Sequence, residues 1–235
     1  MRIALPLAVA ALLGCAGGAF DDYAAEAIDD APGARVLVLG DSVMWWNFDE
    51  EASVSHAMAA ALGQPVVNLS VPGARISAEE PGAAEEGYDI RRQYQPGPWD
   101  WVVFDGGAND LGDECGCGAC DGVLNEMIAP GADAGEIVDL AARIRADGAQ
   151  VLLMGYYAPP ASGGAFEPCA DELAALNARL EAYAAAEDGV WYAGMDEVID
   201  PRARADYDPD RIHPSEDGSR KIGELAAATI RAAPR

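Results

Sequence analysis

Ser42, Asp210 and His213 are the residues of this sequence whose types and spacing could support nucleophilic chemistry. A serine hydroxyl is a weak nucleophile and needs a base that removes its proton during attack. The chain has only two histidines, His56 and His213. His56 falls within a segment of helical periodicity, where a histidine is more often a packing or surface residue. We therefore expect His213 to be the base.

The residues around His213 support this assignment. Pro214 follows it, which disfavours helical backbone at His213 and suits the first turn of a following helix. The imidazole is therefore expected on a loop, free to reach the serine. Asp210 comes three residues earlier, close enough on a tight turn to accept the N–H of the other ring nitrogen. Such a carboxylate would fix the tautomer and stabilise the imidazolium.

Ser42 follows a short apolar run. Residues 35–40, Arg-Val-Leu-Val-Leu-Gly, predict a buried parallel strand, and Gly40 permits a sharp exit from it. Asp41 and Ser42 would then lie just beyond the carboxyl end of the strand, where open α/β sheets bind ligands. Gly-Asp-Ser is also ordinary turn chemistry, and taken alone this segment favours a turn. The later segments reverse that preference.

Four short motifs occur in order along the chain: Gly-Asp-Ser42, an isolated Gly73 after a second apolar run, Gly-x-Asn109-Asp after a third, and Asp210-x-x-His213. Together they resemble the four signature blocks of the SGNH hydrolases, also called GDSL-type esterases. The resemblance extends from about residue 35 to the C-terminal helix. Valine at position 43, where the family name has leucine, is a conservative apolar replacement.

The resemblance implies a serine esterase that needs no cofactor or metal. Its catalytic triad maps onto Ser42, Asp210 and His213, and its oxyanion hole onto the backbone N–H groups of Ser42 and Gly73 and the side-chain amide of Asn109. These donor types suit the chemistry, because the tetrahedral intermediate of acyl transfer carries a negative oxygen. Glycine lets the backbone approach a ligand closely, and asparagine donates two N–H bonds without adding charge.

Four further residues lie close to the motif residues in the sequence. Two are expected to have supporting roles, and two could have either of two roles. Asp110 is expected to cap or stabilise its loop, and Asp41 is expected to hydrogen-bond locally. Trp45 and Trp46 follow the serine closely. Either tryptophan could stack on a sugar or wall an acyl pocket, and either could equally belong to the core.

Alternating strands and helices predict an α/β fold with a parallel sheet covered on both faces. Strands are expected at 35–40, 65–69, 101–106, 151–156 and 190–193, and helices at 51–62, 134–146, 169–186 and 214–233. The family resemblance implies the same architecture, a three-layer α/β/α, flavodoxin-like sandwich with a five-stranded parallel sheet. Residues 78–99 are expected to form a long irregular loop. Its Tyr94 and Trp99 could rim the site or belong to the core, and the core is slightly favoured.

Length and charge limit the classes of protein to which this sequence could belong. A chain of 235 residues is long enough for one domain with a substantial core. Its formal net charge of −25 disfavours binding to nucleic acid or to anionic lipid headgroups. We interpret the acidity as a solvated surface. The sequence does not indicate an oligomeric state.

The N-terminus has the features of an export signal. Residues 1–14 combine a basic start with an apolar stretch too short to span a membrane, which predicts a signal peptide. Leu-Leu-Gly-Cys15 resembles a bacterial lipobox, in which the cysteine is lipidated; simple secretory cleavage nearby is the alternative. Residues 15–33 would then form the lipidated cysteine and a tether, and residues 34–235 the hydrolase domain. We expect a membrane-anchored lipoprotein in the periplasm or on the cell surface.

Four further cysteines remain: Cys115, Cys117, Cys120 and Cys169. An even set in an exported protein predicts two disulfides, and a four-thiolate zinc site is the alternative. A bridge between Cys115 and Cys117 would close a very tight ring. We therefore expect one local bridge to Cys120 and one bridge to Cys169, which together would hold the loop that carries Asn109.

The sequence thus predicts an extracytoplasmic serine esterase whose partner is a small acyl ester or an acylated glycan. Two alternatives stay open. One is acyl transfer to a sugar hydroxyl rather than to water. The other is a catalytically silent binding lipoprotein of the same fold.

Overall fold

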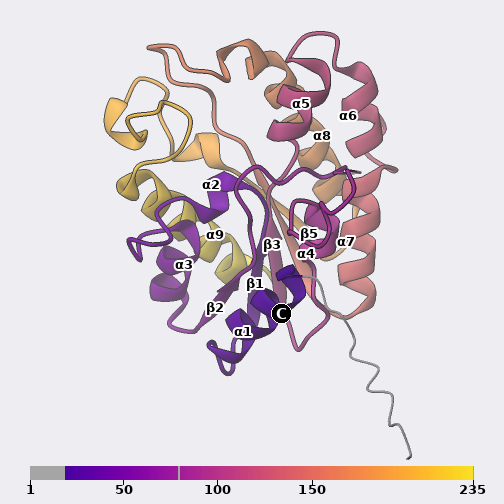
Figure 1. The fold of residues 1–235 in the computed structure, drawn as a ribbon, viewed down its shortest axis with the longest axis vertical. Coiled ribbons are helices and arrows are strands. Elements are labelled where there is room, and N and C mark those ends of the chain that lie inside the picture. Colours follow the sequence, from indigo (N-terminus) through magenta and orange to yellow (C-terminus); the bar gives the residue numbers. More distant parts are fainter. Residues whose placement is uncertain (1–18, 79, 235) are drawn as a thin grey trace, which may run out of the picture.

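The computed structural model describes residues 19–78 and 80–234 (Figure 1). The signal peptide and Cys15 lie outside these residues. Five parallel strands form one sheet in the order β2-β1-β3-β4-β5. The strands are β1 (Val36–Leu39), β2 (Val66–Asn68), β3 (Trp101–Phe104), β4 (Gln150–Gly155) and β5 (Val190–Gly194). The predicted α/β fold with a five-stranded parallel sheet is confirmed.

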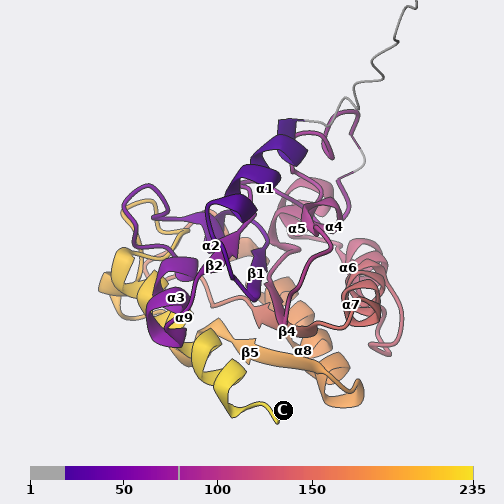
Figure 2. The ribbon, with the colours of Figure 1, turned by 90° about the horizontal axis from the view of Figure 1, so that it is seen from below.

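Helices cover both faces of this sheet. The α-helices are α1 (Ala19–Asp29), α2 (Ser42–Trp45), α3 (Val54–Leu62), α4 (Ile90–Gln93), α5 (Ala108–Cys115), α6 (Asp121–Met127), α7 (Glu136–Ala146), α8 (Ala170–Ala186) and α9 (Glu216–Ala232). Short 3-10 helices are η1 (Glu167–Cys169), η2 (Met195–Glu197) and η3 (Arg204–Asp206). Figure 2 shows α3 and α9 together on one side of the sheet, with α7 on the other. Among the described residues, no helix is both long and apolar enough to cross a lipid bilayer.

The central strands β1 and β3 are apolar along their whole length. All four residues of β1 and all four of β3 are buried, as expected for strands covered on both faces. In the register, Val36 pairs with Val66 of β2 and with Trp101 of β3. The carboxyl ends of the strands therefore meet at one edge of the sheet.

The four predicted helices are present and differ from the observed ones mainly at their starts, whereas α2, α5 and α6 were not predicted and the expected loop around Asn109 is helix α5. The helix expected from residue 51 begins at Val54, because the Ser53 side chain caps it by accepting the N–H of His56. The helix expected from residue 214 begins at Glu216, after a Ser215 cap that accepts the N–H of Gly218. Side-chain caps of this kind satisfy N–H groups that the first turn of a helix leaves open.

The prediction of a tether up to residue 33 is wrong for its described part. Residues 19–29 form helix α1, in which Phe20 and Ala24 are buried against the core. The backbone N–H of Phe20 donates to the carbonyl of Glu85, and the Tyr23 hydroxyl donates to the carbonyl of Asn68. The Ala- and Asp-rich composition suggested a linker, but the two apolar residues on one face anchor a helix.

The segment expected as an irregular loop, described here for residues 78 and 80–99, contains the short helix α4. Tyr94 and Trp99 are buried and belong to the core. The Gln93 side chain is fully buried and pairs with Gly40, accepting its N–H at 2.7 Å and donating to its carbonyl at 3.0 Å. The segment thus supports the turn that follows β1.

The four cysteines form two disulfides, Cys115–Cys120 and Cys117–Cys169, in agreement with the predicted pairing. Bonded in this way, the sulfurs are not the thiolates that a zinc site needs. The second bridge ties the end of α5 to the start of α8.

Candidate active site

Ser42 lies at the carboxyl end of β1, where it begins helix α2. Asp41 caps this helix, since its carboxylate accepts the N–H of Val43 at 2.9 Å. Gly40 has a φ of +137°, and a Cβ at this position would overlap the carboxyl group of Asp105. Only glycine fits at this position. The turn that it forms carries the chain out of β1 and places Ser42 just beyond the end of the strand.

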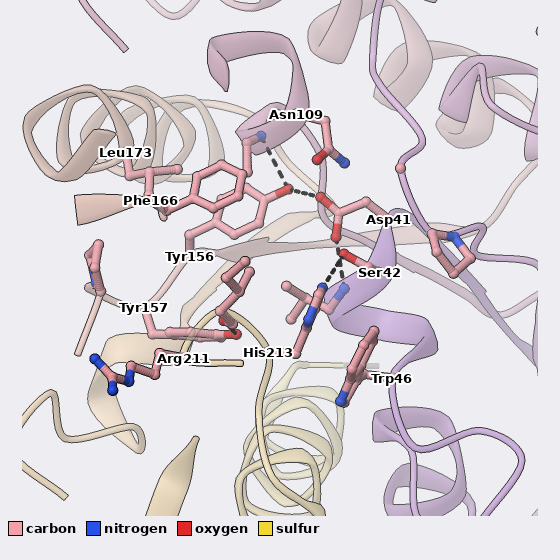
Figure 3. A pocket seen from close by; sticks show the side chains of 16 residues that line it. Asp41, Ser42, Trp46, Asn109, Tyr156, Tyr157, Phe166, Leu173, Arg211 and His213 are labelled. Atoms are coloured by element: carbon pink, nitrogen blue, oxygen red, sulfur yellow. Dashed lines mark hydrogen bonds between the residues drawn. The ribbon is translucent and has the colours of Figure 1, made fainter. Parts of the chain in front are cut away.

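His213 and Asp210 reach Ser42 from the loop that precedes α9 (Figure 3). The Ser42 Oγ atom lies 2.8 Å from Nε2 of His213. The other ring nitrogen, Nδ1, lies 2.6 Å from Oδ2 of Asp210. Residues that are 171 positions apart in the sequence therefore form one continuous hydrogen-bonded chain.

The direction of these bonds follows from the state of Asp210. Burial by itself would raise the pKa of this carboxyl group, but hydrogen bonds from the His213 ring and from the backbone N–H groups of Ile212 and His213 lower the pKa below its usual value. An ionised carboxylate only accepts, so Nδ1 carries the ring proton. Nε2 is then free to accept the hydroxyl proton of Ser42.

The loop around His213 is held in a tight turn. Arg211 has a φ of +62°, and its N–H donates to the carbonyl of Asp208 at 3.0 Å. The Asp208 N–H donates to the carbonyl of His213 at 2.9 Å. Tyr157 lies just after β4, and its hydroxyl donates to the carbonyl of Ile212 at 2.7 Å. These bonds define where the imidazole ring lies.

Trp46 stacks on His213. The two ring centres are 3.6 Å apart and the ring planes differ by 7°. Trp45 points elsewhere and stacks on Phe48. Of the two tryptophans whose role the sequence left open, Trp46 therefore belongs to the site.

Gly73 and Asn109 line the same cavity as Ser42. Gly73 has a φ of +82° in the loop after β2. Asn109 lies in the first turn of α5, and its Nδ2 atom donates one bond to the carbonyl of Ala74 at 2.9 Å. An amide carries two N–H groups, so one remains for a ligand. Asp110 is buried and accepts the N–H groups of Ile76 and Ser77, so it holds the loop after β2 rather than its own segment, which is the first turn of α5.

The motifs and their geometry agree with the comparisons to known proteins. The model of the GDSL-like lipase/acylhydrolase family matches residues 38–221, which is most of the chain. The chain belongs to this family. It is therefore a GDSL-type enzyme that acts on ester bonds. Comparison with curated proteins found no match.

Several solved structures share the fold of this chain over most of their length, at low sequence identity. A carbohydrate acetylesterase from Sinorhizobium meliloti is 18% identical with a TM-score of 0.60, and the match covers 85% of this chain and 99% of that one. The native aryl esterase of M. smegmatis is 17% identical with a TM-score of 0.62, covering 85% and 99%. A GDSL-like lipase from Bacteroides thetaiotaomicron is 20% identical with a TM-score of 0.60, covering 91% and 98%. At these identities the similarity concerns the fold.

Behind the serine of this GDSL-type hydrolase lies a buried polar network. Asp41, which donates its backbone N–H to Asp105 Oδ1 at 3.0 Å, also accepts the Tyr156 hydroxyl at 2.6 Å. Burial raises the pKa of Asp41, and burial together with the nearby Asp41 charge raises the pKa of Asp105 well above its usual range. The Tyr156 hydroxyl in turn lies 3.4 Å from the N–H of Ala108, beside Asn109. The network connects the nucleophile turn with the start of α5.

His56 lies away from this site, as predicted. Its Nδ1 atom bonds to the Ser53 hydroxyl at 2.8 Å, and its ring contacts Phe48. Sequence reasoning missed Tyr156 and Tyr157, although they lie at the end of the predicted strand 151–156 and the strand-end rule could have marked them. Phe166 and Leu173 carried no such signal, because only the packing of a distant loop and α8 brings them to the cavity.

Proposed function

We propose that the protein is a serine esterase in which Ser42 is the nucleophile, His213 the general base and acid, and Asp210 the residue that orients His213. The observation that carries this proposal is the chain from Ser42 Oγ through both ring nitrogens of His213 to Asp210, at 2.8 and 2.6 Å. It opens on a cavity of about 400 Å³.

In the first step, Ser42 Oγ attacks the ester carbonyl carbon while its proton moves to Nε2 of His213. The tetrahedral intermediate then collapses, and the bond from the carbonyl carbon to the alcohol oxygen breaks. His213 gives the proton to that oxygen, and the alcohol leaves. The product of this step is an acyl-serine, and Asp210 stabilises the imidazolium that exists in between.

In the second step, water takes the place of the alcohol. His213 removes a proton from the water as its oxygen attacks the acyl carbon, and the bond to Ser42 Oγ then breaks. The proton returns to the serine oxygen and the carboxylic acid leaves. The enzyme is thereby restored to its starting state.

The backbone N–H groups of Ser42 and Gly73 and the free N–H of the Asn109 amide are the donors that we assign to the negative oxygen of both intermediates. All three groups lie around the same cavity. The bond that one N–H of the Asn109 amide donates to the Ala74 carbonyl orients the amide, and thereby the other N–H. Such donors stabilise the transition state more than the ground state.

We further propose that the enzyme acts outside the cytoplasm, anchored through a lipidated Cys15. Two disulfides support an oxidising compartment. The basic and apolar start of the chain followed by Leu-Leu-Gly-Cys supports export and lipidation. The substrates are small acyl esters or acylated glycans, in keeping with the fold that the chain shares with a carbohydrate acetylesterase and an aryl esterase.

Labelling with a fluorophosphonate probe tests this function. The unchanged protein should become labelled and hydrolyse p-nitrophenyl esters. Ser42→Ala should abolish both, because a covalent nucleophile contributes many orders of magnitude in rate. His213→Ala should lose nearly as much, whereas the matched variant His56→Ala should keep its activity.

Asn109→Ala should lower kcat by about a hundredfold with a smaller change in KM.

Three outcomes would contradict parts of the proposal. A folded Ser42→Ala protein with unchanged turnover would overturn the mechanism. An inert, unlabelled native protein would favour a silent binding protein. Product in which the acyl group moves to an added sugar, rather than to water, would favour the acyltransferase alternative.

A further inference from the structure

The cavity beside Ser42 has one wall made almost entirely of carbon. Tyr156 and Tyr157 come from the end of β4, Phe166 from the loop before η1, and Leu173 from α8. In Figure 3 the labelled Phe166, Leu173 and Tyr157 lie on the side of Ser42 away from Trp46. Leu173 is 5% exposed, and both tyrosines are similarly buried. Packing against the core therefore fixes the shape of this wall.

The two tyrosines add apolar surface rather than hydrogen-bonding groups. The Tyr156 hydroxyl donates to Asp41 at 2.6 Å, and the Tyr157 hydroxyl donates to the carbonyl of Ile212 at 2.7 Å. Both polar ends are thus bound to protein, which leaves the ring carbons to face the cavity. A sugar placed against this wall would leave its hydroxyl groups without partners, which costs free energy.

The reaction geometry indicates which half of an ester this wall contacts. The alcohol oxygen has to lie next to Nε2 of His213, because that atom supplies its proton. The carbonyl oxygen points toward Asn109 and Gly73. With the alcohol and the carbonyl oxygen placed in this way, we assign the acyl substituent to the carbon-lined side of the cavity.

We propose that the carbon-lined side of this cavity binds the acyl group as an apolar chain of medium length, roughly four to ten carbons, since the whole cavity of about 400 Å³ must also hold the ester group and the alcohol. The inference rests on the proposed esterase function. An acetyl group would leave most of the apolar wall without contacts, so it would gain little of the available binding free energy.

Arg211 limits the pocket at its far side. In Figure 3 its guanidinium lies beyond Tyr157, away from Ser42. The side chain is exposed, and its one hydrogen bond within the described residues is a long contact of 3.5 Å to the carbonyl of Ser162. An acyl chain that reached this group would strip water from a charge, which is unfavourable. Long fatty acyl chains are therefore expected to bind less well.

A series of p-nitrophenyl esters from acetate through butyrate, hexanoate and octanoate to palmitate tests the proposal, since the leaving group stays constant. Each methylene that enters the pocket should raise kcat/KM by up to about fourfold. We expect hexanoate to exceed acetate by at least about tenfold, and palmitate to fall below octanoate.

Substitutions in the wall make the test specific. Leu173→Trp fills the pocket and should lower the ratio of hexanoate to acetate kcat/KM at least about tenfold. Ala174→Trp, on the exposed side of the same helix, is the matched control and should leave the ratio unchanged. If Leu173→Trp does not fold, Phe166→Ala serves instead, because loss of the half-buried ring removes acyl contacts and should lower the same ratio several-fold.

Two results separate this inference from the proposed function. If acetate has the highest kcat/KM, or if both wall variants keep the native ratio, the acyl-pocket assignment is wrong while the esterase function stands. If no ester in the series is hydrolysed, the proposed function fails and this inference fails with it.

Discussion

The indole ring of Trp46 lies flat against the imidazole of His213, with 3.6 Å between ring centres. This contact restrains the ring plane of His213, while Asp210 restrains its rotation through Nδ1. The imidazole is thus held from two directions in the position where Nε2 meets Ser42. The stacked indole also shields one face of the ring from water.

Trp46→Ala should lower kcat/KM by roughly two- to tenfold, since aromatic pairs contribute about 0.5–1.5 kcal/mol beyond buried area. Trp46→Phe should retain part of the effect, because a smaller ring can still stack. Trp45→Ala is the matched control, since Trp45 stacks on Phe48 and does not line the cavity. Steady-state kinetics on a short-chain ester measure all three; equal losses for Trp45→Ala and Trp46→Ala would contradict a positioning role.

Asp105 should make the protein less stable as the pH rises. Its pKa in the folded protein lies well above the unfolded value of about 4, first because of burial and then because of Asp41. Between the two values the folded state holds one more proton than the unfolded state, so the free energy of unfolding falls with rising pH. Asp105→Asn cannot ionise and should lose this part of the slope.

Urea unfolding at several pH values above 4 measures this effect. As the pH rises, the free energy of unfolding of Asp105→Asn should increase relative to that of the native protein. Asp121→Asn, an exposed aspartate, is the control and should follow the native curve. A native pH slope in Asp105→Asn would show that Asp105 does not hold the extra proton.

Among the secondary structure elements, α5 and α8 are joined by the Cys117–Cys169 bridge. Helix α5 carries Asn109 and α8 carries Leu173, so the bridge connects the assigned oxyanion hole to the acyl pocket. The Cys115–Cys120 bridge closes only a local loop. The two disulfides should therefore differ in what they stabilise.

Replacing Cys117 and Cys169 together by alanine should lower the free energy of unfolding by up to about 4 kcal/mol, the loop-entropy value for the separation of 52 residues. Replacing Cys115 and Cys120, separated by 5 residues, should cost about 2 kcal/mol. Urea unfolding compares the two double variants, and kcat on a short ester shows whether the long bridge supports the site. A smaller loss for the long bridge would contradict the chain-entropy argument.

For the molecule as a whole, the described residues form a folded unit that starts at α1, close to the proposed anchor. Phe20 and Ala24 hold this helix against the core, so few residues separate Cys15 from the enzyme. With a formal net charge of −25, the enzyme is repelled by anionic lipid surfaces. Attachment to a membrane would therefore depend on the lipid.

Cys15→Ser should prevent lipid attachment and release active enzyme into the soluble fraction. The reason is that the residues assigned to the site all belong to the described part of the chain, which begins at residue 19. Palmitate incorporation and the distribution of esterase activity between membrane and soluble fractions measure both effects. Palmitate that remains attached in Cys15→Ser would contradict the lipobox assignment.

The sequence alone determined the sheet, the order of the motifs and the pairing of Asp210 with His213. These depend on local patterns, since apolar runs predict the strands and the Asp-x-x-His spacing places Asp210 beside His213. With only two histidines in the chain, composition nearly decided the choice of base. Helix starts were less predictable, because side-chain caps such as Ser53 decide them.

The tertiary structure decided what depends on contacts between distant residues. It turned the expected tether into α1, because Phe20 finds a site in the core. It placed Trp46 on His213, and it brought Phe166 and Leu173 to the cavity beside Ser42. An apolar residue in a sequence does not reveal whether it will fill the core or line a pocket, because that depends on which surfaces the folded chain leaves uncovered.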